Sequence, residues 1–238
     1  MYIDVAFLPS ELPSDISSKT VIVVDVLRAS STIVTALGNG CRRIIPVADV
    51  ERARQIAREL GNNVLLCGER GGLKVDGFDF GNSPLDYRAN IVSGKDIVFT
   101  TTNGTQAIQA ARNSRTLFVG TFLNLSSVVR RSLGLGDDVI ILCAGRRGTF
   151  SLEDSVCAGM FVKELCVLGG FRIKLRDSAL AAKQLFASFQ GDIQKVFHAS
   201  EHGKILLSLG MERDLDFCAL IDVFNIVPLF QKDSLQPS

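Results

Sequence analysis

Five times in this chain a short run of apolar residues ends at a polar cluster, and a helical pattern then begins. The five junctions read VIVVD-VLRASS, VLLCGERGG, IVFTTTNGT, LFVGTF and VIILCAGRRGTFSLED. The apolar runs are rich in β-branched or leucine residues and several lack polar alternation, which is typical of strands covered on both faces. Strands that alternate with helices form right-handed crossovers. We therefore predict a three-layer α/β/α fold around a largely parallel sheet.

The same patterns give the boundaries of the elements. The predicted strands are Val21–Asp25, Arg43–Val47, Val64–Cys67, Asp96–Thr101, Thr116–Gly120 and Val139–Ala144. The predicted helices are Ser30–Leu37, Val50–Leu60, Thr105–Arg112, Leu125–Leu133 and Leu152–Leu168. The helix at 50–60 has a clear construction, because Asp49 is a good N-cap and Gly61 a good terminator. We expect an ordinary covering helix there.

The last quarter of the chain is predicted to be mainly helical. Residues 179–210 have a helical pattern, and the following segment ends in a strand-like piece whose Pro228 suits a sheet edge. The final eight residues, QKDSLQPS, are expected to be frayed. Composition does not shift along the chain, so we predict one domain, 1–238. A smaller C-terminal lobe beginning near residue 170 stays open as an alternative.

Composition excludes several classes of protein. Among 238 residues, 47% are hydrophobic and the formal net charge is +1, so the chain carries a large core and no overall basic field for nucleic acid. No apolar run reaches the ~18 residues of a membrane span, and the start lacks a signal-peptide pattern. We expect a soluble, cytoplasmic protein that binds neither nucleic acid nor membrane.

Cysteine and histidine spacing argues against a metal site of the common zinc types. The six cysteines form no CxxC pair and most lie in apolar runs, so they are expected to be buried, reduced thiols. His198 and His202 stand four residues apart and could share a helix face. Without an HExxH pattern, the spacing favours no metal-binding role for them.

Acidic and arginine residues follow two of the predicted strands. Asp25 and Arg28 come after the first junction, and Glu69 and Arg70 after the second. Since the carboxyl ends of parallel strands share one crevice, these side chains are expected to converge. A carboxylate there suits Mg²⁺, and an arginine can hold a phosphate bidentately. The alternative for the first pair is a local ion pair with the following serines as helix caps.

Two further segments are candidates for holding an anionic substrate. Residues 101–105 combine hydroxyls, an amide and backbone N–H groups at a helix start, namely Thr101, Thr102, Asn103, Gly104 and Thr105. An ordinary N-cap explains part of this pattern. The polar, glycine-rich loop 68–83 contains Asn82, which is a candidate ligand for substrate or for metal-bound water. The next two residues, Ser83 and Pro84, suit a helix start.

The fifth junction supplies two more arginines, Arg146 and Arg147. The SLED sequence beyond them resembles a capping box, so Glu153 and Asp154 are candidates for either helix capping or metal binding. Four arginines at strand ends exceed the needs of one phosphate, which points to a substrate with further acidic groups.

Familiar nucleotide and hydrolase motifs are absent. The chain has no GxxxxGK[ST], GxGxxG or GxSxG sequence, and DVLR lacks the second aspartate of DxDx[TV] phosphatases.

Taken together, the motifs resemble those of the 2-phosphosulfolactate phosphatase family. They are VVDVLRASSTIVTAL, CGERGG, GFDFGNSP, TTTNGT, CAGRRGTFSLEDSVCAG, and the HG and DLDFCALID sequences near the end. The resemblance implies a Mg²⁺-dependent phosphatase with a three-layer α/β fold. It further implies hydrolysis of (2R)-phospho-3-sulfolactate to 3-sulfolactate and phosphate, as in coenzyme M biosynthesis. The extra acidic groups of such a substrate would use the surplus arginines.

The resulting hypothesis assigns Mg²⁺ to Asp25 and Glu69, with help from Asp154 or Asp216 near the C-terminus. Either a water attacks with a carboxylate as base, or Asp25 attacks first and forms an aspartyl-phosphate. Two alternatives stay open: the same chemistry on another small polyanionic phosphomonoester, and a non-catalytic sensor of a small acidic metabolite. A homo-oligomer is compatible with the sequence.

Overall fold

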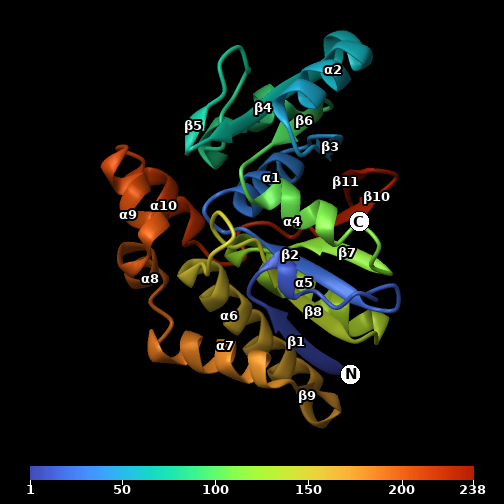
Figure 1. Cartoon of the computed structure of the whole chain (residues 1–238), viewed down its shortest axis with the longest axis vertical. Coiled ribbons are helices and arrows are strands. Elements are labelled where there is room, and N and C mark those ends of the chain that lie inside the picture. Colours follow the sequence, from blue (N-terminus) through green and yellow to red (C-terminus); the bar gives the residue numbers. More distant parts are fainter.

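One mixed sheet of eleven strands runs through the molecule in the order β5-β4-β6-β3-β11-β10-β7-β2-β8-β1-β9 (Figure 1). The computed structural model describes all residues from 1 to 238. The strands are β1 Tyr2–Ala6, β2 Thr20–Val24, β3 Arg43–Pro46, β4 Val64–Arg70, β5 Leu73–Lys74, β6 Asp96–Thr100, β7 Thr116–Val119, β8 Val139–Cys143, β9 Lys174–Leu175, β10 Pro228–Gln231 and β11 Ser234–Pro237. The helices are α1 Ala29–Gly38, α2 Val50–Leu60, α3 Ala89–Val92, α4 Gly104–Ala110, α5 Leu125–Leu135, α6 Leu152–Gly169, α7 Asp177–Ser188, α8 Ile193–Ala199, α9 Glu201–Ser208 and α10 Glu212–Cys218.

Both faces of the sheet are covered, which confirms the predicted three-layer α/β/α fold. Along β2, Ile22 and Val24 belong to a core cluster with α5, α6 and α7, whereas Val21 and Val23 belong to a cluster with α1 and α4. Every residue of this strand is buried. A strand packed on both faces needs apolar side chains at successive positions, which explains the unbroken VIVV run.

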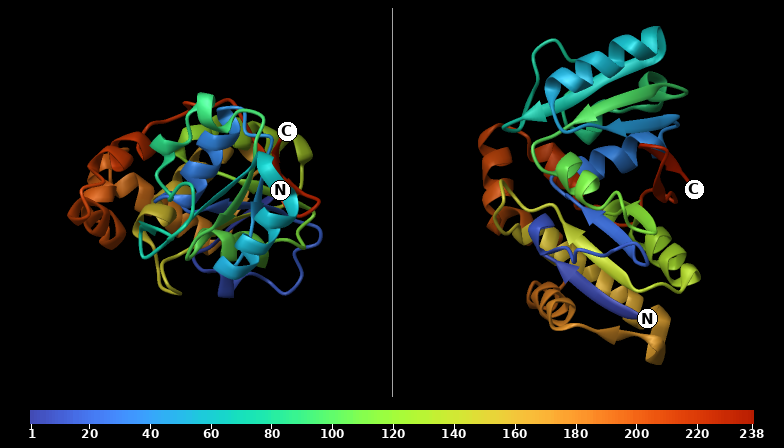
Figure 2. Two further views of the ribbon diagram at one scale, coloured as in Figure 1. Left: turned by 90° about the horizontal axis from the view of Figure 1, so that it is seen from above. Right: turned by 45° about the vertical axis from the view of Figure 1, so that its right-hand side comes forward.

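Apart from β5, which is antiparallel to β4, the sheet consists of two parallel parts joined by an antiparallel hairpin. Strands β4, β6 and β3 are parallel to one another, and so are β7, β2, β8, β1 and β9. The hairpin β10–β11 lies between them, where β10 pairs with β7 and β11 with β3. The second view in Figure 2 shows the C-terminal segment between the two parts. The C-terminal hairpin therefore joins the two parallel parts into one sheet.

Two sequence-based expectations about this segment are wrong. Pro228 lies in the interior of the sheet, as the first residue of β10, and the last eight residues form most of a hairpin instead of fraying. Leu235 is fully buried in the core. The turn residues Lys232 and Asp233 have φ values of 49° and 57°, as a two-residue hairpin turn requires. Neither is the Asn or Gly that normally signals such a turn, so the pattern did not reveal it.

The carboxyl ends of the parallel strands lie on one side of the molecule, where α8, α9 and α10 also lie (Figures 1 and 2). The helical prediction for residues 179–210 is confirmed, but the segment forms the three helices α7, α8 and α9. The break between α8 and α9 is at Ser200, which caps α9 by accepting a hydrogen bond from the Gly203 N–H. His198 and His202 consequently belong to different helices. Gly203 is required there, because a Cβ atom would meet the Phe197 carbonyl oxygen at 1.9 Å.

The covering helix 50–60 forms as predicted, since Asp49 accepts a hydrogen bond from the Arg52 N–H at 2.7 Å and Gly61 ends the helix.

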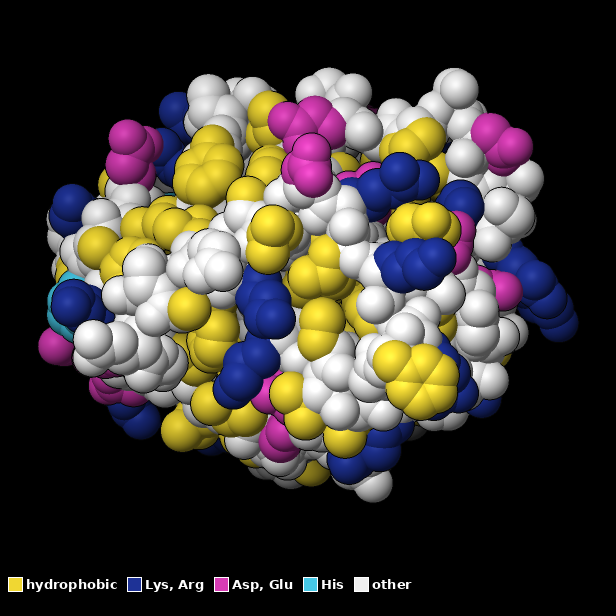
Figure 3. All heavy atoms as spheres, turned by 90° about the horizontal axis from the view of Figure 1, so that it is seen from below, with side chains coloured by type: hydrophobic (Ala, Val, Ile, Leu, Met, Phe, Trp, Pro, Cys, Tyr) yellow, Lys and Arg dark blue, Asp and Glu magenta, His cyan; other side chains and the backbone are white.

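Figure 3 shows the underside of the molecule, where basic and acidic side chains are interspersed with hydrophobic ones. This face therefore has no extended patch of a single charge sign, in agreement with the formal net charge of +1. None of the helices has the length and apolar character needed to cross a membrane.

Candidate functional site

A polar cavity of about 250 Å³ lies where the strand ends meet α9. Its lining comes from the end of β4 and the glycines after it, the loop before α4, the hairpin after β8, and α9 itself. The lining residues are Glu69, Gly71, Gly72, Thr102, Asn103, Arg146, Arg147, His202 and Ile205. Segments from positions 69 to 205 thus meet at one place, as the parallel topology predicts.

A much smaller chamber adjoins this cavity and shares Glu69, Asn103 and His202 with it. Asp25 and Asn82 also line the chamber. Its volume is about 10 Å³, which is room for one water-sized species. The chamber lies beside a cavity large enough for a small organic anion.

Asp25 follows the last residue of β2 and is held in one orientation. Its backbone N–H donates to Ser30 Oγ at 2.8 Å, and its Oδ1 accepts from the Ala29 N–H at 3.3 Å. A Cβ atom on Gly104 would lie 2.7 Å from Asp25 Oδ2. Gly104 therefore serves the site by allowing α4 to begin directly against this carboxylate.

Glu69 is fixed by two backbone donors from different loops. Its Oε1 accepts from the Thr102 N–H at 2.8 Å, and its Oε2 accepts from the Gly72 N–H at 2.7 Å. Each oxygen keeps a free lone pair. This buried carboxylate therefore ties the β4–β5 turn to the loop before α4 and still has capacity for a further partner.

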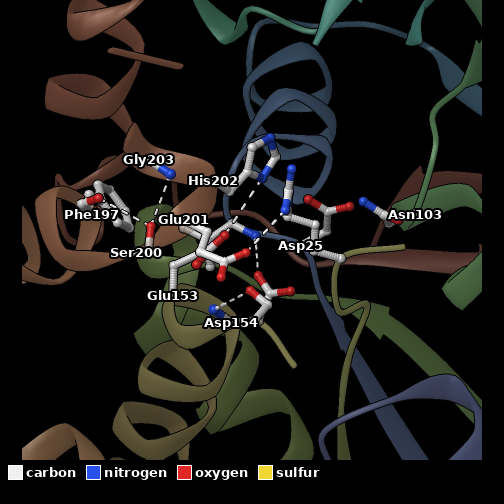
Figure 4. A network of polar contacts seen from close by, with 12 residues as sticks. Asp25, Asn103, Glu153, Asp154, Phe197, Ser200, Glu201, His202 and Gly203 are labelled. Carbon is white, nitrogen blue, oxygen red and sulfur yellow. Dashed lines mark hydrogen bonds and ion pairs between the residues drawn. The ribbon is translucent and has the colours of Figure 1, made fainter. Parts of the chain in front are cut away.

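A group of acidic residues and one histidine surrounds Asp25 (Figure 4). Glu153 and Asp154, from the first turn of α6, are both buried. Asp154 Oδ1 accepts from the Val26 N–H at 2.9 Å, and Glu153 Oε1 lies 3.6 Å from His202 Nδ1. Ser151 caps α6 by accepting from the Asp154 N–H, as the capping-box pattern predicted. Capping therefore explains Ser151, while both carboxylates face the neighbourhood of Asp25.

Burial and mutual repulsion shift the ionisation of these carboxyl groups. Burial raises the pKa of Asp25 to about 6, with Glu69 and Glu153 adding to the rise and with His202 and the Ala29 N–H opposing it. Burial also raises the pKa of Asp154 well above its usual range, and the charges of Asp25 and Glu153 add to this. The charges of neighbouring carboxyl groups thus add to both pKa shifts, and a bound cation would oppose them.

The raised pKa of Asp25 makes a prediction about stability in the absence of divalent ions. Between pH 4 and pH 6 the native state holds a proton that the unfolded state has released, so this carboxyl group destabilises the fold as the pH rises through that window. We expect the melting temperature of Asp25→Asn, minus that of the wild type, to be near zero at pH 4 and clearly positive at pH 8. Calorimetry in chelator at both pH values measures it. A difference that does not change with pH would contradict the assignment.

Arg28 has a different surrounding from the one expected of a phosphate ligand. Its Nη1 lies 2.5 Å from Asp214 Oδ2, and its Nη2 donates to the Gly72 carbonyl at 2.8 Å. Both side chains of the ion pair are buried. The predicted ion pair exists, but its partner is Asp214 of α10, not Asp25. Arg28 reaches the small chamber and not the larger cavity.

Other predicted site residues lie beside the cavity without lining it. Arg70 turns away, donating to Thr100 Oγ1 and to the Ala48 carbonyl. Thr101 and Thr105 bond to each other, since Thr101 Oγ1 accepts from the Thr105 N–H. Asp216 is exposed on α10, where its Oδ1 accepts from Gln194. Within residues 101–105, only Thr102 and Asn103 reach the cavity.

Two of the predicted residues carry unused polar atoms. Asn82 Oδ1 and Thr102 Oγ1 are buried and have no hydrogen-bond partner. An orphaned buried oxygen costs about 1–3 kcal/mol, so its presence at a cavity indicates a missing partner.

Comparison with known proteins identifies the family of this chain. A model of the 2-phosphosulpholactate phosphatase family matches residues 6–233. The chain belongs to this family. A protein of Thermotoga petrophila is 46% identical over 95% of this chain and 94% of its own length. A protein of Clostridium novyi is 41% identical over 97% of both chains, and one of Symbiobacterium thermophilum is 40% identical over 91% of this chain and 93% of its own. Each of the three is named probable 2-phosphosulfolactate phosphatase.

The donor set of this family member fits a hard divalent cation. No three His, Cys, Asp or Glu groups form a metal cage by themselves. The chamber is nevertheless lined by Asp25, Glu69 and Asn82, and the Oδ1 of Asn82 has no hydrogen-bond partner. Mg²⁺ usually takes one or two carboxylates and keeps the rest of its shell for water and phosphate oxygens. An open oxygen site beside an anion cavity therefore suits Mg²⁺ better than a closed cage would.

Sequence reasoning missed the roles of His202 and Asp214, and it did not predict that Glu153, a candidate for helix capping or metal binding, lies against His202. His202 lines both the cavity and the chamber, Glu153 lies against it, and Asp214 holds Arg28. The HG dipeptide at 202–203 was a signal for the first, because a glycine directly after a histidine on a helix has little reason to be there unless backbone must approach closely. Nothing in the sequence linked Asp214 to Arg28, 186 positions away.

Proposed function

We propose that this protein is a Mg²⁺-dependent phosphatase that hydrolyses (2R)-phospho-3-sulfolactate to 3-sulfolactate and phosphate. The observation that carries the proposal is the placement of a small chamber lined by two buried carboxylates directly beside an arginine-lined cavity of about 250 Å³. The names of the relatives support the substrate. This is the reaction such an enzyme would contribute to coenzyme M biosynthesis.

The cavity residues would bind the anionic groups of the substrate. Arg146 and Arg147 supply two guanidinium groups, which match a carboxylate and a sulfonate in geometry and charge. Thr102 supplies a free buried hydroxyl. Asn103 is oriented for its task, because its Oδ1 accepts from the Arg147 N–H at 2.9 Å. Arg147 has a φ of 51°, so this bond also holds strained backbone at the cavity.

Mg²⁺, when bound by Asp25 and Glu69, would neutralise charge on the phosphoryl group during transfer. Asp154 lies buried beneath these residues and supports the loop after β2 through the Val26 N–H. It is the better candidate than Asp216 for an additional carboxylate, since Asp216 is exposed on α10.

Two routes for the attack are compatible with this arrangement. A carboxylate can take the proton of a water that attacks phosphorus, with the P–O ester bond breaking to the lactate oxygen. Alternatively, an Asp25 oxygen attacks phosphorus and displaces that same oxygen, after which water hydrolyses the aspartyl-phosphate. His202, which lies 3.6 Å from Glu153 and lines the cavity, is available to hold a proton near the leaving oxygen.

Release of inorganic phosphate tests the proposal. We expect the purified protein to hydrolyse phosphosulfolactate with Mg²⁺, to lose at least about 10²-fold in rate in EDTA, and to regain it when Mg²⁺ is restored. The same assay on phospholactate and phosphoglycerate, which lack the sulfonate, measures how far the acidic groups select the substrate.

Three outcomes would count against the proposal. Unchanged turnover in EDTA would remove the metal role. A preference for another acidic phosphate ester would keep the proposed phosphatase reaction but reject phosphosulfolactate as its substrate. Tight binding of phosphosulfolactate without phosphate release over hours would favour a sensor of a small acidic metabolite.

A further inference from the structure

Asn82 has one unexplained feature. It is 5% exposed, and its Oδ1 is fully buried without a hydrogen-bond partner. The backbone around it is well anchored, because its carbonyl accepts from Thr32 Oγ1 at 2.9 Å and the next residue, Ser83, donates to Asp214 at 2.7 Å. The backbone at Asn82 is thus held in place by its neighbours, while the side-chain oxygen is left without a partner.

Asn82 lines the chamber of about 10 Å³ together with Asp25 and Glu69. A chamber of this size admits one water or one metal ion. The two carboxylates meet there from the ends of β2 and β4, and each still has a free lone pair. Three residues with side-chain oxygens, from three separate segments, therefore line one water-sized space.

The charges around this space favour a cation over a neutral water. Arg28 reaches the chamber, but its guanidinium is taken up by Asp214 and by the Gly72 carbonyl. His202, the other basic group of the chamber, lies against Glu153. Neither group is free to neutralise both Asp25 and Glu69. Two carboxylates and an amide oxygen form a hard ligand set, which matches Mg²⁺ or Mn²⁺ and not a thiophilic metal.

From this geometry we infer that Asn82 Oδ1 is a direct ligand of the divalent cation, the third protein oxygen beside those of Asp25 and Glu69. This inference rests on the proposed function for the presence of a metal. It assigns to Asn82 a role that differs from holding the substrate. The ion would supply the partner that Oδ1 lacks, and the remaining coordination positions would stay open to water and phosphoryl oxygens.

Mn²⁺ binding without substrate tests this directly. Mn²⁺ is titrated into the metal-free protein, and the loss of the free-ion EPR signal reports binding independently of turnover. We expect Asn82→Ala to weaken Mn²⁺ binding at least about tenfold. Asn82→Asp, which keeps an oxygen in place, should bind Mn²⁺ at least as tightly as the wild type. The matched control is Asn62→Ala, which removes an exposed amide on the turn after α2 and should leave affinity unchanged.

Folding is checked by thermal unfolding in chelator. Asn82→Leu fills a similar volume and removes the orphaned oxygen, so we expect its metal-free melting temperature to equal or exceed that of the wild type. We also expect the increase in melting temperature that Mn²⁺ gives the wild type to be strongly reduced in this variant.

The Mn²⁺ titrations test the ligand role of Asn82, whereas the phosphate-release assay tests the proposed phosphatase function. Wild-type affinity for Mn²⁺ in both Asn82→Ala and Asn82→Leu would overturn the ligand role. If the wild type binds no Mn²⁺, the inference fails, and the phosphate-release assay decides separately whether the protein hydrolyses the ester without a metal.

Discussion

Asp25→Asn is expected to lower phosphatase activity by about 10³-fold or more while leaving the metal-free protein at least as stable as the wild type at pH 8. Activity falls under either route of attack, because Asp25 would be a metal ligand in one and the nucleophile in the other. Stability is retained because the amide keeps an oxygen to accept from the Ala29 N–H and removes a buried charge. Since the pKa of Asp25 is raised to about 6, the gain is on the order of 3 kcal/mol.

The measurement pairs phosphate release under saturating Mg²⁺ with calorimetry of the same sample. Asp76→Asn is the matched control, because it makes the same change at an exposed carboxylate of the loop after β5. It should leave both quantities unchanged. Asp25→Asn with more than a tenth of wild-type activity would remove this residue from the mechanism, and a large loss of stability would show that the carboxylate is structural.

Arg28→Ala is expected to have the largest effect on stability of the substitutions considered. It leaves Asp214 buried without its ion-pair partner and the Gly72 carbonyl without its side-chain donor. Removing one partner of a buried ion pair costs about 3–5 kcal/mol. For a chain of this size, the melting temperature should fall by roughly 10 °C. Arg28→Lys keeps the charge and loses the second branch, so its effect should be intermediate.

A double substitution distinguishes positioning from phosphate binding. Arg28→Met with Asp214→Leu replaces the buried pair by apolar groups, and such replacements recover much of the lost stability. We expect this variant to regain both stability and a substantial part of kcat, because Arg28 acts by holding α10 and the turn after β4 in place. Recovered stability with activity still absent would mean that Arg28 contacts the phosphate itself. An unchanged melting temperature in Arg28→Ala would contradict the buried pair.

The elements of the sheet were predictable because their signals are local. A strand covered on both faces must be apolar at every position, so VIVV in β2 and VIILC in β8 could be recognised without knowing their neighbours. The cap at Asp49 and the terminator at Gly61 act within one turn of the helix. The hairpin β10–β11 was not predictable in this way. Its turn lacks Asn-Gly, and each strand contains a proline.

The site was predictable in part for a related reason. Parallel strands bring their ends together, so residues at those ends, such as Glu69, Asn103 and Arg146, reach one cavity wherever they lie in the sequence. Which way each side chain then turns depends on its nearest donors. Arg70 turns away because Thr100 and Ala48 offer acceptors. Arg28 is occupied because α10 brings Asp214 against it.

By itself, the sequence determined the layered fold, the strands that build it and the edge of the sheet at which the chemistry lies. These follow from hydrophobic periodicity and strand direction, which are properties of neighbouring residues. Only the tertiary structure decided that Arg28 forms its ion pair with Asp214. It also decided that His202 and Glu153 lie near Asp25, and that Asn82 has an unpartnered oxygen. Such pairings depend on distances between segments far apart in the chain, and their energies arise from burial that no local pattern records.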